Sequence, residues 1–115
     1  LGYGTLFGDA AWAINPIGRL YKTQLREVAA ELDIPEAILT KPPSADLWVG
    51  QSDEEELGIS YADADMILHL LLDEEHSPAE INEMGVDGEA VDGVVARVAA
   101  NAFKSLPAGV AELEL

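Results

Sequence analysis

The stretch KPPSADLWVGQSDEEELGIS, residues 41–60, separates two parts of the sequence that both show helical patterns. It opens on the rigid pair Pro42-Pro43, contains Trp48 among small and polar residues, and runs through four acidic residues at 53–56. Neither helical nor strand periodicity is visible until it ends. Connections longer than about 12–15 residues without secondary structure are uncommon and are usually functional loops or linkers. The sequence therefore predicts a long irregular connection with a function.

Before this connection, an apolar stripe at helical spacing predicts one amphipathic helix after Gly18. The stripe consists of Leu25, Val28, Ala29 and Leu32. Pro35 ends this helix, because a residue that precedes proline is pushed out of the helical region. A short turn of helix over residues 35–39 follows, with proline at its first position.

After the connection, capping residues predict where further helices begin. Ser60 and Asp63 resemble a capping pair for a helix that runs to about Leu72. The sequence SPAE at 77–80 supplies an N-cap serine, a proline at the first helical position and a glutamate three residues after the cap. Gly85 suits the left-handed residue just past the end of that helix.

A last helix begins near Asp87 and stops before Pro107. Its apolar stripe consists of Val91, Val94, Val95, Val98 and Ala102. Only LGYGTL, residues 1–6, suggests a strand end. Two architectures fit: an isolated helical bundle, or helices that cap the edge of a parallel sheet whose other strands lie upstream. In the second, the valine stripe would lack its partner, and an exposed apolar patch predicts self-association. Because the opening residues read like the middle of a domain, we expect that an N-terminal portion is missing.

The charge balance limits the ligands. The 115 residues carry 6 Lys and Arg against 22 Asp and Glu, a formal net charge of −16. Such a field repels phosphates, so neither nucleic acid nor an anionic membrane is an expected partner, and an anionic ligand must be held locally by a few lysines or by a metal. No cysteine, signal peptide or long apolar run is present. A cytoplasmic protein is the simplest interpretation.

A few side chains are candidates for chemistry, each with a structural alternative. Lys22 lies in the first turn of a helix, where an ammonium reaches phosphate, although a solvated surface lysine is the commoner case. Asp9 lies in a glycine-rich turn and suits a backbone cap. The acidic run at 53–56 is most simply a solvated face, with Mg²⁺ as an alternative. His69 fits the edge of the core better than a metal site.

Four motifs, in order along the chain, resemble the NAD synthetase family. GYGTLFGD at 2–9 is similar to its Gly-Tyr-x-Thr-x-Tyr/Phe-Gly-Asp turn, and INPIGRLYKTQ at 14–24 to its Asn-Pro-x5-Lys-Thr/Arg-Glu/Gln. KPPSADLWVGQSDEEELGISY at 41–61 resembles the segment between two of the family's helices. NAFKSLP at 101–107 looks like a frayed form of its C-terminal His/Phe-Lys-Arg-x-x-Pro. The resemblance covers essentially all 115 residues.

This resemblance implies an α/β parent fold of the N-type ATP pyrophosphatase kind, with helices on both faces of a parallel sheet, in which this chain forms a mostly helical C-terminal part. It also implies a homodimer that uses ATP and Mg²⁺. In the family reaction, the nicotinate carboxylate of deamido-NAD attacks the α-phosphate of ATP, pyrophosphate leaves, and ammonia displaces AMP to give NAD. Residues 41–58 would be the loop that covers the substrates.

Carried over position by position, Lys22 matches the family lysine on the ATP phosphates and Ser44 matches the loop residue that contacts ATP. Asp9 and Glu56 match carboxylates near the deamido-NAD nicotinate and ribose. Lys104 stands where a basic residue reaches the dinucleotide. No metal ligand is carried over, since the expected ligands belong upstream.

Three positions depart from the family pattern: Leu6 replaces a lysine, Ala13 an aspartate and Phe103 a histidine. The family's Ser-Gly-Gly-x-Asp-Ser phosphate loop does not occur in these 115 residues, so we expect this chain alone to be inactive. A helical interaction module derived from the family is the alternative, and another ATP pyrophosphatase, such as a GMP synthetase, is a third. The sequence leaves open whether the nitrogen comes from ammonia or from glutamine.

Overall fold

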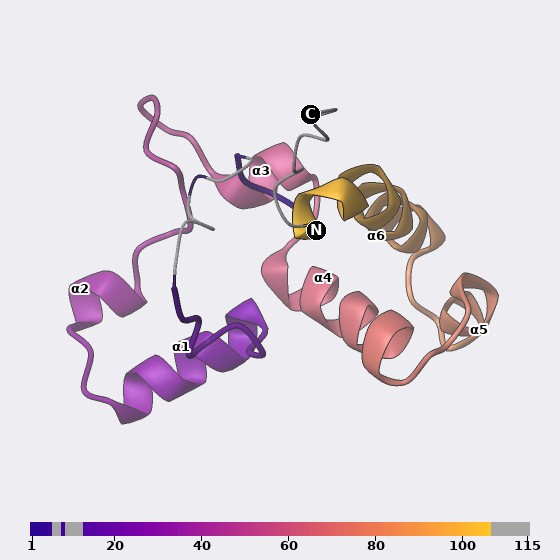
Figure 1. Ribbon diagram of the computed structural model, residues 1–115, viewed down its shortest axis with the longest axis horizontal. Coiled ribbons are helices and arrows are strands. Elements are labelled where there is room, and N and C mark those ends of the chain that lie inside the picture. Colours follow the sequence, from indigo (N-terminus) through magenta and orange to yellow (C-terminus); the bar gives the residue numbers. More distant parts are fainter. Residues whose placement is uncertain (6–7, 9–12, 107–115) are drawn as a thin grey trace, which may run out of the picture.

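The computed structural model describes residues 1–5, 8 and 13–106, and all the regular structure among them is helical (Figure 1). The helices are α1 (Lys22–Glu31), α2 (Glu36–Leu39), α3 (Asp53–Leu57), α4 (Tyr61–Leu68), the π-helical turn η1 (His69–Asp73), α5 (Pro78–Glu83), α6 (Gly88–Asn101) and the 3₁₀ turn η2 (Ala102–Ser105). The prediction of a mostly helical chain is therefore confirmed. The strand end predicted at residues 1–6 is not formed over 1–5, because no other described segment is extended beside it.

The helix starts follow from capping residues. The Ser77 hydroxyl accepts the N–H of Glu80 at 3.3 Å, and the Glu80 carboxylate accepts the N–H of Ser77 at 2.8 Å, so the predicted capping box is confirmed. Ser60 likewise accepts the N–H of Asp63 at 3.1 Å. Gly85, at φ +90°, ends α5 in the left-handed region, where a residue with a Cβ is disfavoured.

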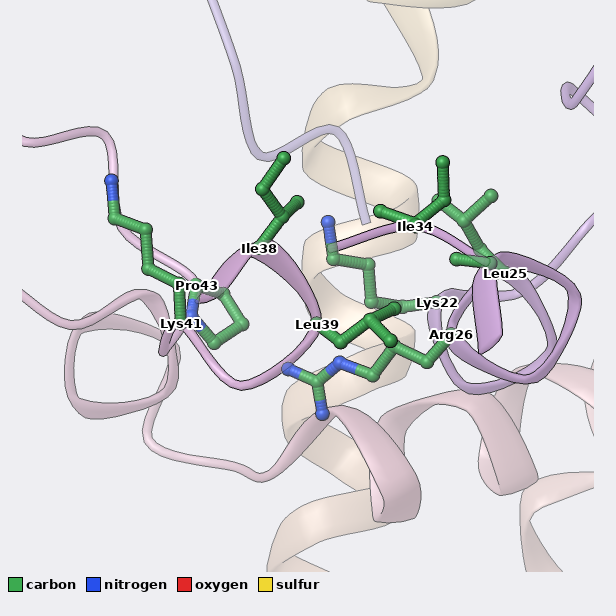
Figure 2. A pocket seen from close by; sticks show the side chains of 9 residues that line it. Lys22, Leu25, Arg26, Ile34, Ile38, Leu39, Lys41 and Pro43 are labelled. Carbon is green, nitrogen blue, oxygen red and sulfur yellow. The ribbon is translucent and has the colours of Figure 1, made fainter. Parts of the chain in front are cut away.

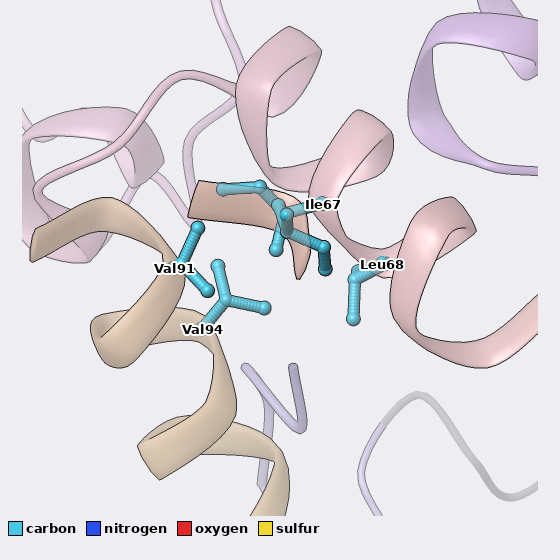
Figure 3. Packing of buried hydrophobic residues seen from close by; sticks show 5 residues of the cluster. Ile67, Leu68, Val91 and Val94 are labelled. Atoms are coloured by element: carbon cyan, nitrogen blue, oxygen red, sulfur yellow. The ribbon is translucent and has the colours of Figure 1, made fainter. Parts of the chain in front are cut away.

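The core lies between α4, α5 and α6. Ile67, Ile81 and Val91 have no exposed surface, and Leu68 and Val94 complete the cluster. Figure 3 shows Ile67 and Leu68 of α4 facing Val91 and Val94 of α6. The expectation that the valine stripe of α6 lacks a partner is therefore wrong, because α4 and α5 cover it within this chain.

Helices α1 and α2 contain no buried residue. The predicted stripe of α1 is exposed over much of its length: Val28 is 39% exposed and Leu32 68%. One buried contact ties α1 to the core helices, since the carboxylate of the buried Asp65 on α4 accepts the N–H of Thr23 at 2.7 Å. α1 is therefore a helix with an open apolar face.

The connection at 41–60 is shorter than predicted, because its second half contains α3. Gly58, at φ +71°, ends this helix in the left-handed region. Half of the acidic run also packs inward: Asp53 and Glu54 are only partly exposed, and Glu54 accepts the N–H of Tyr61 at 2.8 Å. The solvated acidic face predicted for residues 53–56 is therefore limited to the last two of them. What remains irregular is residues 40–52, which rise away from the helices between α2 and α3 (Figure 1).

The irregular part is closed at its base by one backbone hydrogen bond, in which the N–H of Asp53 donates to the carbonyl of Pro43 at 3.0 Å. Its tip is apolar and exposed: Leu47 is 74% exposed, Trp48 59%, and Val49 fully. The segment thus has a fixed base and an apolar tip with little to pack against.

Candidate functional site

Half of the basic side chains of this acidic chain line one cavity. The cavity has a volume of about 180 Å³, and its basic lining residues are Lys22, Arg26 and Lys41, three of the six Lys and Arg in the sequence. The rest of the lining is apolar: Leu25, Ala29, Ile34, Ile38, Leu39 and Pro43. In Figure 2, Lys22 and Arg26 reach from α1 toward the segment that carries Leu39 and Lys41. An apolar wall with a cationic rim suits a ligand with both a flat apolar part and an anionic part.

Lys22 is at the first position of α1, where free backbone N–H groups favour an anion. Its side chain is exposed, and its ammonium lies 5.7 Å from the centre of the Tyr61 ring. Arg26 follows one helical turn later, so the two cations lie on one face of α1. The arrangement concentrates positive charge at one end of the cavity.

Lys41 and Ser44 lie at the start of the irregular segment. Lys41 forms an ion pair with Asp46, and in Figure 2 its ammonium points away from Lys22 and Arg26. The Ser44 hydroxyl accepts the N–H of Asp46 at 3.0 Å. Ser44 follows Pro43 of the cavity wall, so both sequence-predicted ATP residues, Lys22 and Ser44, are at or beside the same cavity.

A second group of polar contacts surrounds the N-terminal segment. The Tyr3 hydroxyl donates to Glu56 at 2.5 Å, and the Gln51 amide donates to the same carboxylate at 2.8 Å. These two hydrogen bonds, the one from Tyr3 first, lower the pKa of Glu56, so this carboxylate stays ionised. The same contact raises the pKa of Tyr3 to about 12, so its hydroxyl remains a donor.

Lys104 holds the other side of this segment. Its ammonium donates to the carbonyls of Gly2 at 2.7 Å and of Gly4 at 2.8 Å. Gly2 has φ +62°, and a Cβ at this position would lie 2.2 Å from the Cβ of Asn101. Only glycine therefore fits where the segment crosses the end of α6. The result is that Glu56 and Lys104, two of the predicted dinucleotide residues, lie on either side of residues 2–4.

The other sequence-predicted positions have separate outcomes. Asp9, the third predicted dinucleotide residue, and Leu6 lie outside the described residues. Ala13 is exposed, and Phe103 is 54% exposed. His69 is not at the core edge, as the sequence suggested, but on the surface.

His69 ends α4 with an exposed side chain, at the junction with the π-helical turn. Its Nδ1 lies 2.8 Å from a carboxylate oxygen of Asp73, and its Nε2 3.2 Å from one of Glu74. The hydrogen bond to Asp73 raises the pKa of His69 and lowers that of Asp73. Both ring nitrogens of His69 therefore face carboxylates, and the predicted location at the edge of the core is wrong.

Sequence reasoning missed three residues of these sites: Arg26, Tyr3 and Asp65. The position of Arg26 four residues after Lys22 was a usable signal, since residues at that spacing share a helix face. Tyr3 and Asp65 gave no local signal, because their partners are 53 and 42 residues away.

The described residues contain no group of three or more His, Asp or Glu side chains placed to hold a metal ion. One carboxylate oxygen, Oδ1 of Asp53, is buried without a hydrogen-bond partner, but a single such oxygen does not make a Mg²⁺ site. The part of the chain that the structure describes therefore does not fit Mg²⁺ by itself. It also includes no helix long and apolar enough to cross a bilayer.

The fold and the sites define a helical segment with a cavity that is lined by basic and apolar side chains. Sequence comparison is more specific: residues 1–108 match the NAD synthase family, and the chain belongs to that family. It is similar to proteins named NH(3)-dependent NAD(+) synthetase. The one from Chlorobium phaeobacteroides is 50% identical over 113 residues, which are 98% of this chain and 41% of that protein.

Two further relatives with the same name give the same picture. The protein of Wolinella succinogenes is 50% identical over 105 residues, 91% of this chain and 41% of the relative. That of Helicobacter pylori is 51% identical over 108 residues, 90% of this chain and 42% of the relative. The chain thus spans about two fifths of the length of the curated relatives that it matches.

Proposed function

We propose that this chain contributes part of the active site of an NAD synthetase, which uses ATP to convert deamido-NAD to NAD. The observation that carries the proposal is the cavity lined by Lys22, Arg26 and Lys41 in a chain of net charge −16. Lys41 is paired with Asp46, so the repulsion that an anion would offset is that between Lys22 and Arg26 on one face of α1. Membership of the NAD synthase family supports the phosphates of ATP as that anion.

In the proposed reaction, the nicotinate carboxylate attacks the α-phosphorus of ATP and pyrophosphate leaves. Ammonia then attacks the adenylated carboxyl carbon and AMP leaves with the bonding electron pair. Lys22 and Arg26 neutralise charge that moves onto the leaving phosphates, and Ser44 donates a hydrogen bond to ATP. This kind of catalysis rests on position and electrostatics more than on proton transfer.

The second substrate is proposed to bind around the N-terminal segment. Glu56 and Asp9 would accept hydrogen bonds from ribose hydroxyls near the nicotinate, and Lys104 would fix the segment that forms the floor of the site. The bonds from Tyr3 and Gln51 support this role, because they keep Glu56 ionised and in one orientation.

Residues 40–52, which overlap the predicted covering loop at 41–58, are proposed to close over the two substrates. The base of the loop is fixed by the bond from Asp53 to Pro43, and its apolar tip is exposed. Closure would bring Ser44 over the cavity and exclude water from an adenylate that water would hydrolyse. The Lys41–Asp46 pair would open at that point and release Lys41 for phosphate.

The remaining family properties are proposals of the same kind. The parent α/β fold is supported by the open apolar face of α1, which suits a helix that covers a sheet. The shared name of the relatives supports ammonia as the nitrogen source. A homodimer, Mg²⁺ held by residues outside this chain, and a cytoplasmic location stay predictions from the sequence.

The proposal is tested in the full natural polypeptide that contains these residues. Purified protein with deamido-NAD, ATP and ammonia is expected to form NAD, AMP and pyrophosphate in equal amounts. Arg26→Ala is expected to raise KM for ATP or lower kcat by about tenfold or more, since a charge-assisted hydrogen bond is worth about 1.5–3 kcal/mol. Arg19→Ala is the matched control, because Arg19 lies three residues before Lys22 and outside the cavity.

Two results would contradict the proposal. Absence of turnover by the full natural polypeptide would favour the non-catalytic interaction module. Equal effects of Arg26→Ala and Arg19→Ala would mean that the cavity is not the ATP site.

A further inference from the structure

Helix α4 holds the first turn of α1 by two side chains that lie one helical turn apart, Tyr61 and Asp65. Asp65 is buried, and its carboxylate accepts the N–H of Thr23, the residue after Lys22, at 2.7 Å. This N–H is among those that a helix start leaves without a partner. Asp65 therefore caps α1 from another helix and fixes the backbone beside Lys22.

Tyr61 holds the other end of the lysine. Its ring centre lies 5.7 Å from the ammonium of Lys22, within the range of a cation–π contact. The ring is itself held, because its hydroxyl donates to Asp53 at 3.1 Å. Burial, and then this hydrogen bond, raise the pKa of Tyr61 to about 12, so the ring stays neutral.

We propose that Tyr61 is a positioning residue for Lys22: its ring face holds the ammonium at the cavity before phosphate arrives. The inference rests on the proposed role of Lys22 at the ATP phosphates. A lysine has a flexible four-carbon stem, and restricting it in advance reduces the entropy lost when it meets the phosphates. The contact of Lys22 with the phosphates strengthens in the transition state, where the phosphate charge changes, and this part of the effect appears in kcat.

The same ring also connects Lys22 to the base of the covering loop. Asp53, which accepts the Tyr61 hydroxyl, donates its own N–H to the carbonyl of Pro43. The hydrogen bond that holds the Tyr61 ring therefore requires α3 to be packed against α4. Loss of the hydroxyl alone keeps the ring but removes this connection.

The test uses four variants of the full natural polypeptide: Tyr61→Leu, Tyr61→Phe, Lys22→Ala and the double variant Lys22→Ala/Tyr61→Leu. At saturating ATP, deamido-NAD and ammonia, Tyr61→Leu is expected to lower kcat about two- to fivefold, the range of an exposed cation–π contact. Tyr61→Phe keeps the ring and is expected to lose less than about twofold. In the Lys22→Ala background, Tyr61→Leu is expected to change nothing further, and KM for deamido-NAD is expected to stay constant throughout.

A second readout does not depend on turnover. The NMR signals of the Lys22 side-chain methylene next to the ammonium are expected to move when Tyr61→Leu removes the ring current and to stay in place in Tyr61→Phe. Unmoved signals in Tyr61→Leu, equal kcat losses for the Phe and Leu variants, or the same loss with and without Lys22 would each overturn the inference about Tyr61. If Lys22→Ala leaves kcat unchanged, the ATP assignment of Lys22 is itself wrong, and the inference fails with it.

Discussion

The two sides of this chain are stabilised in different ways. Helices α4, α5 and α6 enclose their own core around Ile67, Ile81 and Val91. Helices α1 and α2 and residues 40–52 bury no side chain, and α1 is tied to the core helices by Asp65 and Tyr61. Yet the cationic cavity lies on the poorly buried side.

The residues that stabilise the fold and the residues of the proposed ATP site therefore lie in different parts of the chain. The radius of gyration is 16.8 Å, against roughly 13 Å for a compact chain of this length. The excess agrees with the open side of the chain, where α1 and α2 bury no side chain. Residues that meet a ligand have to stay accessible, whereas the residues that order the fold lie elsewhere.

The largest expected effect tests the core side. Ile67→Ala removes a fully buried side chain and is expected to lower the free energy of unfolding by about 2–5 kcal/mol. Leu32→Ala is the matched control at the end of α1, because Leu32 follows the last helical residue and its side chain is 68% exposed. It is expected to cost at most about 0.5 kcal/mol in the 115-residue chain. Urea unfolding measures both.

The two variants Ile67→Ala and Leu32→Ala also test whether further structure covers α1. In the full natural polypeptide, the cost of Leu32→Ala is expected to rise well above its value in the 115-residue chain if α1 covers a sheet. Equal costs for Ile67→Ala and Leu32→Ala in the 115-residue chain would remove the distinction between the two sides.

The next effect concerns the two lysines at the two sites. In the full natural polypeptide, Lys22→Ala is expected to lower kcat about 100-fold, because it stabilises charge that develops in the transition state. Lys104→Ala is expected to act mainly on KM for deamido-NAD, since its bonds to Gly2 and Gly4 fix the shape of a binding segment. Steady-state kinetics with each substrate varied in turn decides, and equal losses of kcat would show that the roles are wrongly assigned.

A smaller effect is expected for residues 40–52. Limited proteolysis without ligand is expected to cut within 45–52, because the tip is exposed and proteases need an extended segment. Cuts are not expected at residues 53–57, because these residues form the helix α3. ATP with deamido-NAD is expected to suppress these cuts in the full natural polypeptide. Unchanged cleavage would make the segment a linker and not a lid.

The smallest expected effect is a pH dependence of stability, which arises from the exposed His69–Asp73 pair at the end of α4. Asp73 raises the pKa of His69 above 6.5, and His69 lowers that of Asp73 below 3.8. The stabilisation from the protonated histidine is therefore complete below pH 6.5 and is lost as the pH rises through the raised pKa. That from the carboxylate is complete above pH 3.8 and is lost as the pH falls through the lowered pKa.

Both partners are exposed, so solvent screens the pair and the effect is small. The difference in Tm between the wild-type chain and His69→Gln is expected to be larger at pH 5.5 than at pH 8.5. A difference independent of pH would contradict the ion pair. Asp73→Asn is the control, because it removes the negative partner of the same ion pair.

Local signals made part of this fold predictable. The capping box of Ser77 and Glu80 and the left-handed Gly85 act within a few residues, so the sequence alone locates α5. The same reasoning was available for α3, where Ser52 is followed three residues later by Glu55 and where Gly58 ends the helix, but the acidic run concealed it. The error at the valine stripe of α6 has another cause, since periodicity shows that a face is apolar but not which helices cover it.

The candidate site was predictable only where a motif carried it. Lys22 and Ser44 were identified through the family resemblance. Lys22 lines the cavity together with Arg26, and Ser44 follows the lining residue Pro43 in the sequence. The contacts of Tyr3 with Glu56 and of Asp65 with Thr23 depend on how distant segments pack, and no spacing in the sequence encodes such pairs.

The hydrogen bond from the Lys104 ammonium to the carbonyl of Gly2 joins residues that are 102 positions apart. This bond closes a loop over almost all the described residues, whereas the contacts between α4 and α6 close a much shorter one. Because the entropy cost of closing a loop grows with its length, residues 2–4 are expected to detach before the helical core opens. Backbone amide exchange at Tyr3 is therefore expected to be faster than at Ile67.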